Sequence, residues 1–339
     1  MLTPPPDLDV NTVRQALVSG WDIEGIALEF LPVGFGSQHW LATHPDGRRW
    51  FVTVDDHRGG RMGMAEGESV DGLDRAFRVA SAVHDRAGLT FAIGPIPATD
   101  GRAVHRIGAT PWSVALFPHL DAEPLGTGGS SPVADRDGVL QLLSRLHAVP
   151  VSLAAGLARV DDLAIGRRGV LDDALADLDR PWDTGPFAER TRGLLAANAA
   201  DLRQALLGHD ARAAALISDR SAWVITHGEP HAANILRNAA GDLFLIDWDT
   251  VAIGPPERDL WLFDEPLGEA DWSGYPVAAD TGAVTVFPDA IETYRTWWDL
   301  TDISEFVASF RQPHDASETM TASWGYLQGY LPLKSEHLR

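Results

Sequence analysis

The chain has 339 residues, and its 45% hydrophobic and 8% aromatic content is ordinary for a globular protein, which excludes a largely disordered chain. Its 27 basic and 48 acidic residues give a net charge of −21, which disfavours nucleic acids and anionic membranes as partners and would attract a cationic substrate, although an acidic surface often serves only solubility. The absence of cysteine excludes disulfides, thiolate zinc sites and cysteine nucleophiles.

The first third of the chain is predicted to form a small β-rich lobe. A helix begins after Asp9, where Val13, Ala16 and Leu17 recur at helical spacing. Strand-like apolar runs, separated by turns that contain glycine or proline, then predict an antiparallel meander. The expected strands cover residues 27–33, 39–43, 49–54, 103–107 and 113–117, and residues 68–87 have the periodicity of a helix.

The rest of the chain is predicted to be mostly helical from residue 133 onwards. The clearest helices are expected at residues 170–180 and 186–207 and again after 258, and two short strands interrupt them at 223–226 and 243–246. The predicted fold is therefore α+β with the bilobal plan of a protein kinase. Its expected parts are an N-lobe (1–117) that binds the nucleotide, a hinge (118–121) and a C-lobe (122–339) that carries the catalytic loop and the substrate pocket.

A histidine, two carboxylates and an asparagine have a spacing that kinase-type phosphotransferases use. In those enzymes a loop carboxylate accepts the proton of the substrate hydroxyl, while an asparagine and a later aspartate hold Mg²⁺. Here the motif runs from His227 through Glu229 to Asn234, and Asp247 follows the apolar residues 243–246. Glu229 is the candidate base, with glutamate where the kinase pattern has aspartate. Asn234 and Asp247 are the candidate metal ligands, because Mg²⁺ prefers hard oxygen donors.

These residues resemble the aminoglycoside phosphotransferase family, whose kinase-like fold is shared with choline kinases. The resemblance spans roughly residues 25–330, is strongest at 227–249 and in LLSRLHAVP (142–150), and is nearest to the spectinomycin phosphotransferase type. It implies transfer of phosphate from ATP or GTP, with Mg²⁺, to a hydroxyl of a small molecule such as a natural-product antibiotic or an amino sugar. It also implies that His227 supports the catalytic loop through hydrogen bonds and that Asp259 buttresses this loop.

Two segments of the N-terminal part are expected to bind the nucleotide. Gly34, Gly36 and Ser37 lie between the first two strands, where kinases place a loop over the phosphates and glycine allows close backbone approach. The connector between the two lobes, at the hinge, should contact the base of the nucleotide. Its proline has no N–H, so Phe117, His119 or the leucine that follows would donate to the base.

The third strand departs from the kinase pattern. Kinase-like enzymes place a lysine there that pairs with the α- and β-phosphates. Thr53 occupies this position, and the only lysine in the chain is Lys334. Either Arg58, Arg61 or a histidine replaces the missing cation, or Mg²⁺ and backbone donors suffice.

The acceptor pocket is expected in the last third of the chain, where aromatic rings and carboxylates suit a cationic or sugar-like ligand, although a tryptophan-rich helical core gives the same composition. The candidates there are Asp264, Glu265, Trp272, Trp297, Trp298 and Asp299. The rival interpretation is a nucleotide-binding pseudokinase or regulatory protein that has lost the lysine. Because Asn234 and Asp247 remain, an enzyme is favoured. A cytoplasmic location is expected, since neither a signal peptide nor an apolar run of about 20 residues is present.

Overall fold

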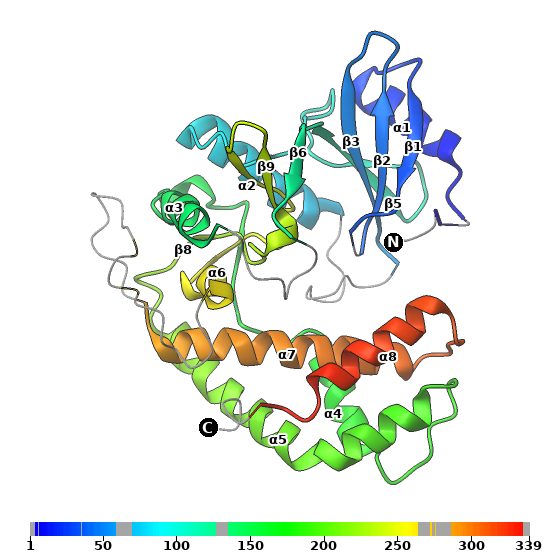
Figure 1. Ribbon diagram of the computed structural model, residues 1–339, viewed down its shortest axis with the longest axis vertical. Coiled ribbons are helices and arrows are strands. Elements are labelled where there is room, and N and C mark those ends of the chain that lie inside the picture. Colours follow the sequence, from blue (N-terminus) through cyan, green and yellow to red (C-terminus); the bar gives the residue numbers. More distant parts are fainter. Residues whose placement is uncertain are drawn as a thin grey trace.

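The computed structural model describes residues 4–5, 7–34, 36–58, 70–126, 135–263, 272, 275 and 286–334. A five-stranded antiparallel sheet forms most of the N-terminal part, and long helices form most of the C-terminal part (Figure 1). The predicted α+β class is confirmed. Within these described ranges, no helix is long and apolar enough to cross a membrane.

The N-terminal sheet follows the predicted meander, with strand order β1-β2-β3-β5-β4. Its strands are β1 (Ala27–Leu31), β2 (Gln38–Thr43), β3 (Arg49–Asp56), β4 (His105–Arg106) and β5 (Trp112–Pro118). Helix α1 (Val10–Trp21) begins where predicted, because the carboxylate of Asp9 accepts from the Asn11 N–H at 2.8 Å and caps its first turn. Helix α2 (Val70–Ala87) is described from Val70 onwards.

The two faces of this sheet have different neighbours, because side chains alternate along each strand. Val52 and Val54 of β3 belong to a buried cluster that includes Leu17 of α1. Phe117 of β5 points to the opposite face, where its ring meets Phe77 of α2 edge-on at 5.3 Å. The residues of β3 that alternate with Val52 and Val54 therefore lie on the α2 side of the sheet.

Two further sheets of three short strands lie beyond the connector. One has the order β10-β9-β6 and the other β7-β11-β8. Their strands are β6 (Ala122–Pro124), β7 (Arg159–Val160), β8 (Val224–Thr226), β9 (Ile235–Asn238), β10 (Leu243–Leu245) and β11 (Ala252–Gly254). The expectation of only two strands in this region was wrong, because strands of two to four residues are too short to show a period-two pattern.

Helices α3 (Arg136–His147), α4 (Arg168–Ala176), α5 (Ala188–Ser218), α6 (Glu257–Leu260), α7 (Pro288–Phe310) and α8 (Glu318–Tyr330) complete the described fold. Helix α5 extends past the predicted range 186–207, because Leu206, His209 and Ala213 are buried and carry the helix across Gly208. Helices α4, α5, α7 and α8 share one apolar cluster, at the opposite end of the molecule from the N-terminal sheet (Figure 1).

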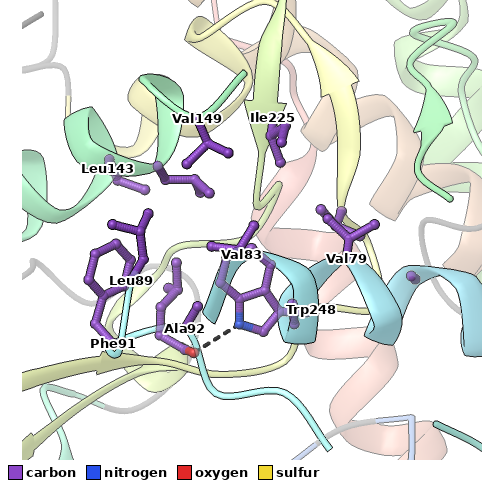
Figure 2. Packing of buried hydrophobic residues seen from close by; sticks show 14 of the residues in the cluster. Val79, Val83, Leu89, Phe91, Ala92, Leu143, Val149, Ile225 and Trp248 are labelled. Carbon is purple, nitrogen blue, oxygen red and sulfur yellow. Dashed lines mark hydrogen bonds between the residues drawn. The ribbon is translucent and has the colours of Figure 1, made fainter. Parts of the chain in front are cut away.

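A second apolar cluster fixes the segment that carries the sequence motif. Trp248 is fully buried among Val79 and Val83 of α2 and Ile225 of β8 (Figure 2). Its indole N–H donates to the carbonyl of Leu245 at 2.9 Å. The residue before this anchored tryptophan is Asp247, so core packing determines where that carboxylate is presented.

Candidate active site

The β9–β10 hairpin brings the two candidate metal ligands to the same end. Ile235 pairs with Leu245, and the Ile246 N–H donates to the carbonyl of Asn234 at 3.0 Å, so Asp247 follows immediately beyond this pair. Asp247 is exposed and has a φ of 62°, a left-handed conformation that is uncommon outside glycine and concentrates at functional sites. The hairpin therefore holds an accessible carboxylate beside Asn234.

Asp259 fixes the loop that carries Glu229. The carboxylate of Asp259 is fully buried and accepts the backbone N–H of His227 at 2.8 Å and that of Gly228 at 2.6 Å. Burial opposes its charge, but the hydrogen bond from His147 and nearby cations keep the pKa of Asp259 below its usual value. These contacts are the ones that a buttress of the loop requires. They leave the side chain of Glu229 partly exposed, at 26%.

Both ring nitrogens of His227 are used within the loop. Nε2–H donates to the carbonyl of Ile246 at 2.8 Å, and Nδ1 accepts from the backbone N–H of Glu229 at 3.3 Å. The ring is fully buried with its edge against Trp248, and burial lowers the pKa of His227 to about 4. A neutral imidazole with both nitrogens in hydrogen bonds is suited to holding the loop.

Hydrogen bonds orient the amide of Asn234. Its Nδ2 donates to the carbonyl of Glu229 at 3.0 Å and lies 3.3 Å from Nε2 of His231. Burial lowers the pKa of His231 to about 4, so its ring is neutral, and in the tautomer with the proton on Nδ1 its Nε2 accepts from this amide. With the NH₂ group held against the loop, Oδ1 is the oxygen of this amide that could serve as a metal ligand.

A buried network behind the loop was not foreseen from the sequence. The guanidinium of Arg258 donates to Oγ1 of Thr226 and to the carbonyl of Thr250, and it pairs with Asp161 at 3.3 Å. Tyr294 of α7 donates to the same Asp161 carboxylate at 2.8 Å. The network ties β8 to α7, and it reaches the loop through Thr250, whose hydroxyl donates to the carbonyl of His227 at 2.9 Å.

His147, the histidine of the LLSRLHAVP stretch, also supports the loop. Its Nε2 lies 3.0 Å from the Asp259 carboxylate, and the hydroxyl of Tyr275 lies 2.8 Å from its Nδ1. The stretch was noticed as a family resemblance, but nothing in its local sequence assigned the histidine a partner. Tyr275 lies 128 positions away in the chain, and no local spacing could have identified it.

The glycine-rich turn has the expected backbone. Gly34 has a φ of 72° and Gly36 a φ of 88°, conformations that glycine adopts without strain. The hydroxyl of Ser37 donates to the buried carboxylate of Asp55 at 2.7 Å, which ties the end of the turn to β3. Phe35, between the two glycines in the sequence, lies outside the described residues.

A cavity of about 850 Å³ opens at the connector. It is lined by Arg49 of β3, by residues 119–125 and by residues 237–239 of the β9–β10 hairpin. His119, one of the candidates for contact with the base, is among these lining residues. The ring of Phe117 packs against Phe77, which leaves the backbone of Phe117 for the donation that the sequence predicts.

Several other candidates fall elsewhere. Arg58 pairs with Asp56 at 2.7 Å and lies 5.1 Å over the ring of Trp112, a residue of the α1-side cluster, so it does not replace the missing lysine. Trp297 is buried in the helical core and donates to the carbonyl of Ala164 at 2.8 Å, which is a packing role. Arg61, Asp264 and Glu265 lie outside the described residues.

Comparisons with known proteins identify the family of the chain. A sequence model described as the phosphotransferase enzyme family matches residues 27–278. Protein StrN of Streptomyces griseus is 27% identical over 323 residues, which cover 92% of this chain and 88% of that protein.

Solved structures share the fold at low sequence identity. The spectinomycin phosphotransferase APH(9)-Ia, in complex with ADP and spectinomycin, superposes with a TM-score of 0.70 at 16% identity, covering 96% of this chain and 95% of that one. The choline kinase LicA of Streptococcus pneumoniae has a TM-score of 0.56 at 14% identity, with 94% and 97% covered. These similarities establish the kinase-like fold.

Proposed function

Because this chain belongs to the phosphotransferase enzyme family, it is an enzyme that phosphorylates a hydroxyl group, and we propose that its donor is ATP or GTP with Mg²⁺. The observation that carries this proposal is the placement of Asn234 and Asp247 at one end of the β9–β10 hairpin, beside the loop of Glu229. The proposed acceptor is a small hydroxylated natural product or amino sugar.

The donor set fits a magnesium ion. Mg²⁺ is usually bound by one or two protein oxygens together with substrate phosphates. Oδ1 of Asn234, whose NH₂ group is bound to the loop, and the exposed carboxylate of Asp247 are such oxygens. When bound there, the ion would neutralise negative charge on the phosphates during transfer.

Glu229 is the proposed base. As the acceptor oxygen attacks the γ-phosphorus, its O–H bond breaks and the proton passes to the Glu229 carboxylate. The bond between the γ-phosphorus and the bridging oxygen breaks, and the nucleoside diphosphate leaves with that electron pair. A side chain that is 26% exposed is reachable by a substrate, while the buried contacts of Asp259 hold its backbone still.

The hinge cavity is the proposed seat of the base, and Gly34 and Gly36 would lie over the phosphates. The acceptor is less defined. One structural neighbour binds spectinomycin and another is a choline kinase, and both of these ligands carry hydroxyls and cationic nitrogens. A net charge of −21 would attract such a cation.

A phosphorylation screen tests the proposal. Purified protein with Mg²⁺ and γ-labelled ATP or GTP is offered spectinomycin, aminoglycosides, macrolides, choline and amino sugars, and the product is identified by mass spectrometry. One acceptor should gain a single phosphate with saturable kinetics, while a parallel Asp247→Ala preparation reports any contaminating kinase. If no acceptor is labelled although calorimetry shows nucleotide binding, the nucleotide-binding regulator is the better interpretation. If no nucleotide binds, the proposed donor is wrong.

A further inference from the structure

The proposed nucleotide site lacks the cation that kinase-like enzymes supply from the third strand. Thr53 holds that position, and Lys334, the only lysine, follows α8 near the C-terminus and not the third strand. Of the two arginines offered by the sequence, Arg58 is held on the α1 side by Asp56 and Trp112. Arg61 lies outside the described residues, so among the described residues the alternative to Mg²⁺ and backbone donors is a histidine.

The strand register identifies a neighbour of Thr53 on the same face. Thr53 alternates with Val52 and Val54, which pack towards α1, so its side chain lies on the opposite side of the sheet. His39 of β2 pairs directly with Thr53 and shares that face. Its Nδ1 lies 3.3 Å from Oγ1 of Thr53, so the two side chains form one unit.

The same ring reaches the glycine-rich turn. A Cβ placed on Gly34 would lie 2.8 Å from Nε2 of His39, so this nitrogen lies against the backbone of the turn. The imidazole is half-buried, and it packs against the ring of Phe51 on β3 at 5.0 Å between centroids. It therefore bridges the vacated lysine position and the turn expected over the phosphates.

We propose that His39, held by Thr53, contacts the α- or β-phosphate of the nucleotide in place of the lysine; this rests on the proposed function. The contact with Thr53 suits either charge state of the ring. The threonine hydroxyl donates to Nδ1 of a neutral imidazole or accepts from Nδ1–H of an imidazolium. In both cases Nε2–H is the donor at the turn. Thr53 is then a positioning residue for His39.

Calorimetry with ADP·Mg²⁺ and with adenosine separates phosphate contacts from base contacts. His39→Ala should weaken ADP binding about 10-fold or more, the value of a hydrogen bond to a charged group, and leave adenosine binding unchanged. His39→Gln, which keeps an N–H donor, should recover part of the loss. Thr53→Lys in the His39→Ala background should restore ADP affinity. The matched control is His44→Ala, in the β2–β3 turn, which should bind ADP like the wild type.

The outcomes are distinguishable. If the wild type binds ADP and both His39 variants bind it equally well, the inference is wrong while the proposed donor stands. Loss of ADP and adenosine binding together in a folded His39→Ala protein also overturns the inference, because a phosphate contact cannot be responsible. If the wild type binds neither ligand, the proposed nucleotide dependence fails and this inference with it. Should His39→Ala not fold, His39→Gln and Thr53→Val decide by the same comparison.

Discussion

Gly228 is predicted to tolerate no side chain because of the arginine behind it. Its φ is 102°, and a Cβ at this position would overlap the guanidinium of Arg258. Arg258 is only 2% exposed, and it binds Thr226, Thr250 and the carboxylate of Asp161. Alanine at position 228 would therefore push a buried cation away from its partners.

The structure offers a control that separates this overlap from backbone strain. Gly241, in the turn between β9 and β10, has a φ of 92°, but a Cβ there meets no atom within 4 Å. Gly241→Ala should cost only the left-handed backbone penalty, ~1–2 kcal/mol. Gly228→Ala carries the same penalty plus ~3–5 kcal/mol for breaking a buried ion pair, so it should lose about 4 kcal/mol or more of the free energy of unfolding.

Urea denaturation of both variants measures the difference, and a phosphoryl-transfer assay on the same samples reports the loop, since Gly228 precedes Glu229. Gly228→Ala should show a much lower midpoint and little activity, while Gly241→Ala stays close to the wild type in both. If the two variants lose the same free energy to within ~1 kcal/mol, the buried arginine does not constrain the loop and the reasoning fails.

Three further outcomes are expected. Glu229→Gln should lower kcat at least ~10²-fold with unchanged ADP affinity, and an undiminished kcat would remove Glu229 from the chemistry. Asp247→Ala should abolish the Mg²⁺-dependent part of nucleotide binding in calorimetry, and retention of that part would place the metal elsewhere. Burial lowers the pKa of His227 and His231 from 6.5 to about 4, so between these values the unfolded chain binds protons that the folded chain excludes. The contribution of each histidine to the free energy of unfolding should therefore fall as pH drops from about 6.5 towards 4, at up to ~1.4 kcal/mol per pH unit, while Glu257 and Asp302, whose pKa values burial raises to about 7 and about 6, act in the opposite direction. The test is therefore the difference from the wild type: His227→Asn should remove the His227 part of the slope in urea titrations. An unchanged slope would show that His227 is not the buried neutral group described.

The parts of the fold with strong local signals could be predicted from the sequence. The strand expected at 49–54 is β3 (Arg49–Asp56), and the helix expected at 68–87 is described as α2 (Val70–Ala87). A period of apolar residues or a glycine in a turn is a local signal. It can therefore be recognised in a single sequence. The short strands β7 and β11 arise from pairing between distant segments, Ala252 with Arg159 for example, and have no such local signal.

The same distinction applies to the site. The spacing of His227, Glu229 and Asn234 could be recognised in the sequence because one loop carries all three. The residues that support this loop could not be identified from the sequence. Tyr294 reaches Asp161 across 133 positions, and a tyrosine in a largely buried helix is indistinguishable from ordinary core until its partner is known. Likewise His39 became a candidate only when the register placed it opposite Thr53.

The two departures from the kinase pattern are predicted to depend on each other. Glutamate is longer than aspartate by one C–C bond, ~1.5 Å, so a hydroxyl activated by Glu229 lies farther from the loop backbone. A phosphate contact from His39 on β2, in place of a lysine on β3, would change where the phosphates rest against the sheet. A misplacement of about 1 Å costs up to ~10²-fold in rate, so the base and the phosphate anchor must match in reach. Glu229→Asp alone should therefore lower kcat strongly, and it should cost less when Thr53→Lys and His39→Ala restore the kinase-like anchor. A double-mutant cycle on kcat measures this coupling, and effects that add to within ~0.5 kcal/mol would show that the base and the anchor act independently.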